Sequence, residues 1–290
     1  GFANLAPSPE TQAFGRTATD TWSLGMFEVA SIHDRIREFL DEPGSDLPVF
    51  DRTALLIHQE ATKDDPDTDK VITYIAQDQI LVAEVLKVAN SSFFRGIKKI
   101  SRIQDAVIRI GLREVVNSVM MATQRKNYSS RNPFVQQYTA TMWKHSVACA
   151  YGAQWLAKRC THPDLAPEAF IAGLIHDVGK LLVLKALVSV GEKDKDAPRI
   201  TKTAADEFVD TMHPECGFLL LEKWNLPETY CHVCRDHHRR DYDPGNILLV
   251  MVRLANLVCR KIGIGLRTDP DMILVTSTEA GILGRSDITL

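Results

Sequence analysis

The sequence predicts an all-α protein built as a multi-helix bundle, and three observations support this fold class. Apolar residues recur at intervals of three and four along most of the chain, which is the periodicity of an amphipathic helix. β-branched residues follow the same spacing, and no segment shows the period-two alternation of a convincing strand. Clusters of Pro, Gly and Asp separate the apolar segments, so we expect consecutive helices joined by turns.

Residues 1–46 form the first predicted unit, an N-terminal arm followed by a helix. The arm, residues 1–20, is rich in Ala, Pro, Ser and Thr and has no periodicity, which is typical of a disordered segment. Apolar residues at helical spacing then predict a helix over residues 22–40. Pro43-Gly44 and Pro48 interrupt this pattern, and we place the junction with the main body there.

Residues 47–130 form the second predicted unit, a helical subdomain. Apolar spacing predicts helices over residues 51–62, 68–76, 79–90, 103–110 and 112–124. Aspartates in the DDPDTD turn are suited to start the second of these helices, and Gly111 is suited to end the fourth.

Residues 131–265 form the third predicted unit, and residues 266–290 are a C-terminal extension. In the third unit, helices are predicted over residues 133–159, 167–187, 213–224, 229–238 and 247–262. The polar residues 191–207 are expected to form a mobile loop between two of these helices.

The composition limits which classes of partner and which cellular compartment fit the protein. The 34 Lys and Arg nearly balance the 37 Asp and Glu, so no electrostatic case exists for a nucleic acid or a membrane surface as partner. No apolar run approaches the roughly 20 residues of a membrane span, and no secretory segment opens the chain. The six cysteines lie mostly in apolar helical segments, which favours reduced, buried thiols over disulfides. We therefore expect a cytoplasmic protein.

Histidines and one aspartate are the candidate metal ligands. They come from separate predicted helices: His145, His176, Asp177, His213, His237 and His238. A single buried histidine is more often a hydrogen-bonded core residue than a ligand. A metal site in a helical bundle, however, needs N and O ligands from several helices, and the two oxygens of Asp177 can bridge two ions. The residues alone leave open whether these histidines are core residues or ligands of one or two divalent transition metal ions, such as Fe, Mn, Ni or Zn.

Four segments carry a resemblance to a known superfamily. They are WKHS (143–146), GLIHDVGK (173–180), MHPECGFLLLEKW (212–224) and DHH (236–238), and they resemble the HD metal-dependent phosphohydrolases. The resemblance implies that the histidines and Asp177 bind metal and that Lys180 meets a phosphate. It also implies a last ligand at Asn256, where the superfamily has an aspartate. An Asn carbonyl oxygen is neutral, so this ligand is expected to hold a metal more weakly.

The first half of the chain resembles a narrower group within this superfamily, the HDOD (HD-related output domain) family. The segments that carry this resemblance are KVANS (87–91) and AVIRIG (106–111), whereas Gln79 departs from the Asp-Pro of the family. The resemblance implies an HD-domain-like second half preceded by an HDOD-specific helical subdomain. It also implies a bacterial signalling output that is generally non-catalytic and acts through protein partners. HPECG and the paired histidines are similar to the HD-GYP phosphodiesterases, but RRDYDPG (239–245) and Thr141 differ from them.

Two function classes follow, and the residues leave both open. The first is a non-catalytic signal-transduction output protein that retains part of an HD-type metal pocket. The alternative is a metal-dependent phosphohydrolase acting on a nucleotide or cyclic dinucleotide, with Asp177 and Lys180 as catalytic residues. A sensor that binds a nucleotide or phosphate ligand without turnover lies between these two.

Overall fold

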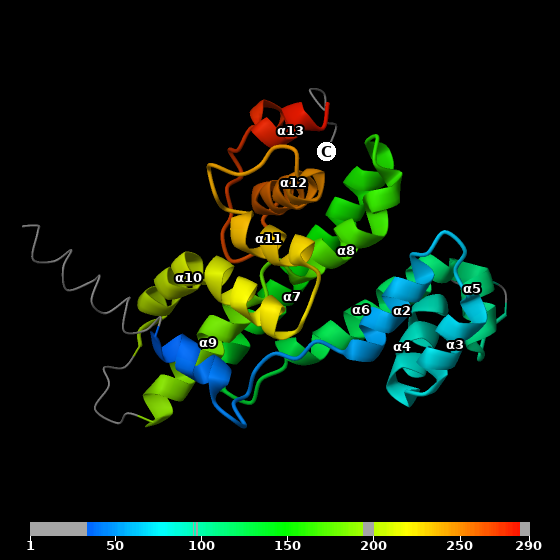
Figure 1. Ribbon diagram of the computed structural model, residues 1–290, viewed down its shortest axis with the longest axis horizontal. Coiled ribbons are helices and arrows are strands. Elements are labelled where there is room, and N and C mark those ends of the chain that lie inside the picture. The colour runs from blue at the N-terminus through cyan, green and yellow to red at the C-terminus, as the bar shows by residue number, and fades with distance from the viewer. Residues whose placement is uncertain (1–33, 95, 97, 194–199, 285–290) are drawn as a thin grey trace, which may run out of the picture.

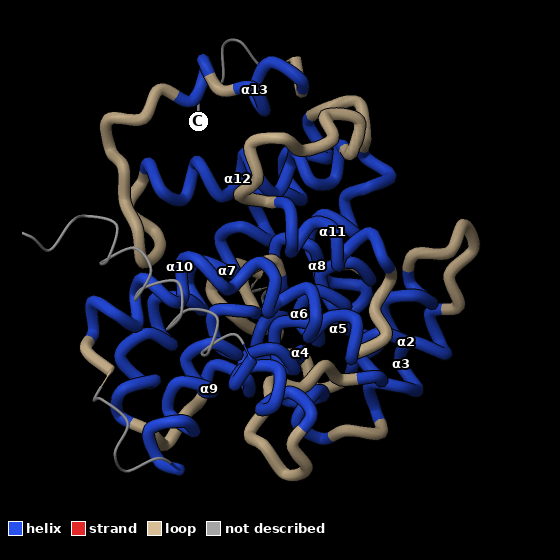
Figure 2. Tube along the Cα trace, turned by 60° about the vertical axis from the view of Figure 1, so that its left-hand side comes forward, coloured by secondary structure: helices blue, strands red, loops and turns tan. Residues whose placement is uncertain are grey.

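The computed structural model describes residues 34–94, 96, 98–193 and 200–284. Within these ranges the chain forms helices and loops and no strand (Figure 2), which confirms the all-α prediction. Residues 34–41 are helical and correspond to the end of the helix predicted over residues 22–40. The predicted arm and the start of that helix lie outside the described residues.

The first region of the fold contains five helices and a short 3-10 turn. They are α2 (Arg52–Ala61), α3 (Thr68–Ala76), α4 (Gln79–Ala89), α5 (Ile103–Ile110), α6 (Leu112–Arg125) and η1 (Lys126–Tyr128). Asp51, Asp67 and Asp78 begin the first three helices, and each side chain accepts a hydrogen bond from a backbone N–H of the first turn. Figure 1 shows these helices gathered at one end of the molecule, and the bounds of the five α-helices lie within one residue of the predicted ones.

The second region is built around the long helix α7 (Pro133–Arg159), capped by Asn132. The other α-helices are α8 (Ala166–Ile175), α9 (Gly179–Lys193), α10 (Lys202–Lys223), α11 (Glu228–Asp236), α12 (Ile247–Lys261) and α13 (Thr278–Ile282). Helices α8 and α12 pack on α7, while α9 packs on α10. The 3-10 turns Pro163–Leu165 and Leu274–Thr276 complete this region.

Three sequence predictions for this region are wrong. The single helix predicted over residues 167–187 is two helices, because the chain turns at residues 176–178 between α8 and α9. The segments on both sides of the turn, residues 169–175 and 181–187, are buried, so the apolar pattern continues across the turn. The polar loop predicted over residues 191–207 ends early, since Thr201 caps α10 and His213 lies well inside that helix. The C-terminal extension, in which no helix was predicted, contains the short helix α13.

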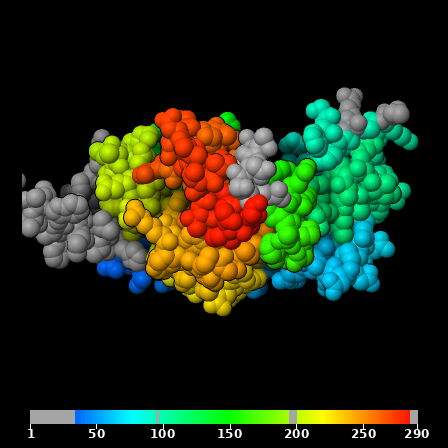
Figure 3. Space-filling view, turned by 90° about the horizontal axis from the view of Figure 1, so that it is seen from above, coloured from blue at the N-terminus to red at the C-terminus, as the bar shows by residue number. Residues whose placement is uncertain are grey.

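The buried apolar side chains of both regions form one continuous cluster, from Ile36 to Ala280. The unit boundary near residue 130 therefore stays a prediction. Figure 3 shows the C-terminal segment, residues 266–284, on the outer face of the molecule, and α13 packs against α12. All six cysteines are free, and five of them are buried. Within the described residues, no helix combines the length and apolarity needed to cross a membrane.

Candidate metal centre

The turn between α8 and α9 carries His176 and Asp177 into the middle of the second region. Gly179 follows directly, and a Cβ atom there would collide with the His213 carbonyl and lie 2.6 Å from the Gly217 backbone nitrogen. The backbones of α9 and α10 are therefore in direct contact. This close approach brings His213 of α10 next to Asp177.

Four imidazoles surround the Asp177 carboxylate. The Oδ2 atom lies 3.2 Å from His145 Nε2 and 3.5 Å from His176 Nε2. The Oδ1 atom lies 3.4 Å from His213 Nε2 and 3.3 Å from His237 Nε2. All five side chains are buried and come from α7, the α8–α9 turn, α10 and the end of α11. The structure thus brings together residues that are up to 92 positions apart in the chain.

Each of the four histidines is oriented by a backbone carbonyl. The Nδ1 atoms of His145, His176, His213 and His237 donate to the carbonyls of Ile264, Gly173, Val209 and Cys234, at 2.7–2.9 Å. Carbonyl oxygens only accept hydrogen bonds, so Nδ1 carries the proton in each ring. In a neutral ring the Nε2 lone pair then points at Asp177. This is the arrangement in which histidines bind metals.

Burial and charge set the protonation of the cluster. Burial lowers the pKa of His176 to about 3, and burial with the nearby Lys180 holds the pKa of His213 well below its usual range. Burial raises the pKa of Asp177, but Lys180 and the histidines outweigh this and keep it well below its usual range. Burial lowers the pKa of His145, but hydrogen bonds with Asp177 and Cys259 raise it to about 9. At neutral pH His176 and His213 are therefore neutral imidazoles beside an ionised Asp177 carboxylate, whereas His145 must give up a proton when it binds a metal.

The donor atoms are suited to a transition metal ion. Nitrogen and oxygen ligands at 2.0–2.2 Å from a tetrahedral ion lie roughly 3.3–3.6 Å apart, which matches the distances around both Asp177 oxygens. His176 Nε2 and Asp177 Oδ1 are buried and have no hydrogen-bond partner among the described residues. We call His145, His176 and Asp177 Oδ2 the first ligand set, and His213, His237 and Asp177 Oδ1 the second. Two groups of residues have ligand atoms that all lie within 4.8 Å of one another and could hold a metal ion: Asp177 with His213, His237 and His238, and His145 with Cys149 and His176.

The remaining predicted residues lie at the edge of this centre. Lys180 Nζ is 2.5 Å from Asp177 Oδ2 and neutralises part of its charge. His238 is exposed, with its ring 4.1 Å from that of His237. Asn256 is buried on α12 and lines a cavity of about 50 Å³ together with His145, Asp177, Lys180 and His238. Such a cavity has room for water molecules or a small anion.

Sequence reasoning missed several residues of this centre. Cys149 lies one helical turn after His145, with its Sγ atom 3.5 Å from His145 Nε2. The spacing of four positions on one helix could have indicated it. Arg253 of α12 donates to the carbonyls of Asp236, His237 and Arg239 at 2.8–3.3 Å and so caps the end of α11. Glu279 of α13 holds the Arg253 guanidinium at 2.7 Å, which connects the C-terminal segment to the paired histidines.

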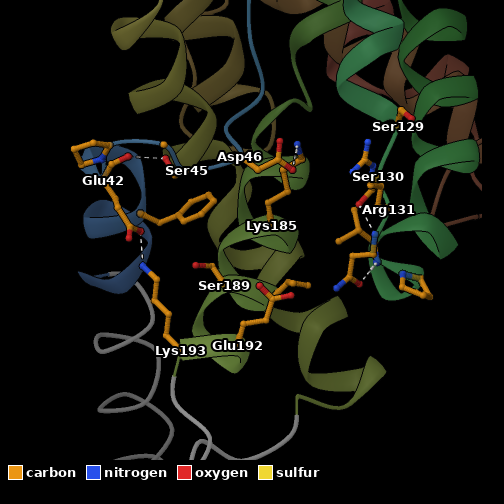
Figure 4. Close-up of a pocket in the computed structure, with 17 residues that line it drawn as sticks. Glu42, Ser45, Asp46, Ser129, Ser130, Arg131, Lys185, Ser189, Glu192 and Lys193 are labelled. Carbon is orange, nitrogen blue, oxygen red and sulfur yellow. Dashed lines mark hydrogen bonds and ion pairs between the residues drawn. The ribbon is translucent and has the colours of Figure 1, made fainter.

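The molecule also has a larger cleft, of about 830 Å³, away from these histidines. Residues 42–46, residues 129–133 and helix α9 form its walls (Figure 4). Lys185 is buried there and lies 2.9 Å from Asp46, while Lys193 pairs with Glu42. These four charges neutralise one another, and none of the predicted site residues lines the cleft. The candidate site is therefore the His/Asp centre.

A comparison with protein families gives one match over most of the chain: the model of the HDOD domain matches residues 47–240. An uncharacterized protein of Treponema pallidum is 28% identical over 240 residues, which is 80% of this chain and 44% of that protein. The uncharacterized protein YuxH of Bacillus subtilis is 28% identical over 141 residues, 46% of this chain and 32% of that protein. The chain thus spans less than half the length of these curated relatives.

Solved structures share the fold. An HDOD domain protein of unknown function from Geobacter sulfurreducens is 26% identical, with a TM-score of 0.69 and coverage of 89% of both chains. A proposed signal transduction protein from Marinobacter aquaeolei has 19% identity and a TM-score of 0.64, covering 88% of this chain and 60% of its own. A proposed metal-dependent phosphohydrolase from Shewanella amazonensis has 20% identity and a TM-score of 0.59, covering 89% and 90%.

Proposed function

Because this chain belongs to the HDOD domain family, we propose that it is a bacterial signal-transduction output protein that holds a divalent metal ion in its His/Asp centre without turning over a substrate. The proposal includes a cytoplasmic location and protein partners. It is supported by the family membership and by structural neighbours proposed to act in signal transduction and in metal-dependent phosphohydrolysis.

One observation carries the metal-binding part of the proposal. Four Nε2 atoms face the two oxygens of one buried carboxylate, and the carbonyl partners of the Nδ1 atoms fix this orientation. In neutral rings these Nε2 atoms accept hydrogen bonds, as the carboxylate does, so they repel one another unless a cation or proton lies between them. A group of this kind is costly to bury without a bound ion.

Two features of the centre favour binding without turnover. The Lys180 Nζ atom lies 2.5 Å from Asp177 Oδ2, so the negative charge of this oxygen is already partly neutralised. Asn256 supplies a neutral oxygen donor to the cavity where a carboxylate would hold the ion more firmly. Asn256→Asp should therefore tighten metal binding, and an unchanged affinity would show that Asn256 does not contact the ion.

Metal analysis of the full chain tests the proposal. Protein purified without chelator should contain a transition metal, and His176→Ala should reduce the metal content strongly. His232→Ala is the matched control, since His232 lies on α11, the helix that leads into His237, and instead pairs with exposed Glu228. The absence of metal from the wild type, even after incubation with Zn²⁺ or Mn²⁺, would refute metal binding.

The alternative is a metal-dependent phosphohydrolase, and the cavity beside Asp177 favours it. Lys180, Arg260 and Arg267 line this cavity and could bind a phosphate group, while Arg267 also pairs with Asp210 at its edge. A divalent metal in such a site supplies Lewis acidity and lowers the pKa of a bound water. Hydrolysis of a panel of phosphodiesters with Mn²⁺ or Fe²⁺ decides between the two functions. Turnover by the wild type, lost in Asp177→Asn, would replace the non-catalytic proposal.

A further inference from the structure

Cys149 is a buried thiol beside the first ligand set, and the proposed function does not use it. It lies on α7, is 0% exposed, and has its Sγ atom 3.5 Å from His145 Nε2. The ligand atoms of His145, Cys149 and His176 all lie within 4.8 Å of one another. His176 Nε2, which has no hydrogen-bond partner among the described residues, completes this group. Two imidazoles and a sulfur therefore share one enclosed space.

We propose that Cys149 is a thiolate ligand of the first ligand set and that it makes this set a site for a thiophilic divalent ion such as Zn²⁺. The inference rests on the proposed function, because it requires that the His/Asp centre binds metal. A zinc ion with nitrogen ligands at 2.0–2.1 Å and a sulfur ligand at 2.3 Å places these atoms roughly 3.5 Å apart. The observed separation of His145 Nε2 and Cys149 Sγ is 3.5 Å.

The charges of the centre also call for a second anion. Asp177 is the carboxylate that contacts the imidazoles, and its Oδ2 atom is shared with Lys180. A divalent ion held by two neutral imidazoles and this shared oxygen keeps an uncompensated positive charge in a buried place. A coordinating thiol loses its proton to solvent and supplies the missing negative charge.

A second cysteine gives a matched control for this role. Cys259 of α12 is also buried, and its Sγ atom lies 3.6 Å from that of Cys149. It also hydrogen-bonds with His145, but it does not belong to the group of ligand atoms formed by His145, Cys149 and His176. Cys259→Ser therefore alters the same packing but leaves the proposed sulfur ligand in place.

The experiment uses Co²⁺ as a spectroscopic probe on the full chain after removal of metal by dialysis against a chelator. A Co²⁺ ion bound by a thiolate gives a sulfur-to-cobalt charge-transfer band in the near ultraviolet. Bands in the visible range report bound Co²⁺ whatever its ligands. We expect the near-ultraviolet band in the wild type and in Cys259→Ser, and its loss in Cys149→Ser. Competition with Zn²⁺ should show at least about tenfold weaker binding for Cys149→Ser.

The outcomes separate this proposal from the one on which it rests. Visible bands without the near-ultraviolet band in the wild type would refute the thiolate ligand and leave the metal centre standing. A band that persists in Cys149→Ser, or that disappears only in Cys259→Ser, would also refute it. No bound Co²⁺ or Zn²⁺ in the wild type would refute both proposals. The wild-type spectrum decides even if Cys149→Ser fails to fold.

Discussion

The two regions of the molecule use their polar side chains differently. In the first region, Asn90 Nδ2 donates to the carbonyls of Leu86 and Ile100, and its Oδ1 atom accepts from the Ile100 N–H, all at 2.9–3.0 Å. In the second region, His176 Nε2 and Asp177 Oδ1 have no such partner among the described residues. The Asn90 amide is hydrogen-bonded by the chain itself, whereas the His/Asp cluster contains buried acceptor atoms without a hydrogen-bond partner among the described residues.

This difference separates a structural polar group from a binding group. A polar group that is fully hydrogen-bonded contributes modestly to stability and orders the chain around it. Asn90 does this by joining the end of α4 to the segment that leads into α5. An unsatisfied buried group reduces stability, and its persistence indicates a ligand that supplies the missing interactions. The first region also has a buried unpaired atom, Gln124 Nε2, but no group of metal-ligand atoms surrounds it among the described residues, so the candidate site lies in the second region.

The largest expected effect on stability comes from disturbing the backbone contact between α9 and α10, which positions the second region. Gly179→Ala places a methyl group against the backbone of α10, and we expect a loss of about 4 kcal/mol in the free energy of unfolding. The same change at Gly191, which is exposed in α9 with no atom within 4 Å of the added Cβ, should be neutral or gain up to about 1 kcal/mol. Urea unfolding of both variants measures this.

Equal stability of these two glycine variants would mean that α9 and α10 are not in direct backbone contact. A folded Gly179→Ala variant that binds metal normally would show that the contact is not needed to position His213.

A buried histidine of the first region provides the second test. Burial lowers the pKa of His58 to about 4 from its ordinary value of 6.5. The folded state therefore binds this proton more weakly than the unfolded state. The resulting stability is fully present above pH 6.5 and is lost as the pH falls toward about 4, by about 3 kcal/mol in total. His58→Leu should lose less stability than the wild type over this range in urea unfolding.

His58 and His145 differ in what sets their pKa. Burial alone lowers the pKa of His58, whereas hydrogen bonds with Asp177 and Cys259 raise the pKa of His145. If His58→Leu and the wild type lose stability equally on acidification, His58 is not a buried neutral group.

The smallest expected effect is on the satisfied amide of the first region. Asn90→Ala removes four hydrogen bonds, including one from Arg109, and leaves the N–H and C=O groups of Ile100 without this partner, so we expect a loss of about 2 kcal/mol. Ser92→Ala, at an exposed position two residues away, should change stability by less than about 0.5 kcal/mol. Metal content should stay at the wild-type value in both variants. Loss of metal in Asn90→Ala would show that the two regions are coupled.

The sequence alone predicted the all-α fold and most helices correctly. The first three helices of the first region have one apolar face and Asp residues at their starts, and both signals are local. The candidate ligands were also named, since histidines in apolar helices stand out. Their roles as ligands remain a proposal, although the structure shows that four of them converge on Asp177.

Only the tertiary structure decided where the chain turns and what meets at that turn. The break between α8 and α9 lies inside a continuous apolar segment, because residues on both sides are buried in the same core. Periodicity reports burial, and a segment buried on all sides has no period to interrupt. Likewise, the meeting of His145, Cys149 and His176 depends on how α7 packs against α8, which no local pattern encodes. The residue types set the available chemistry, and helix packing determined which of them share one site.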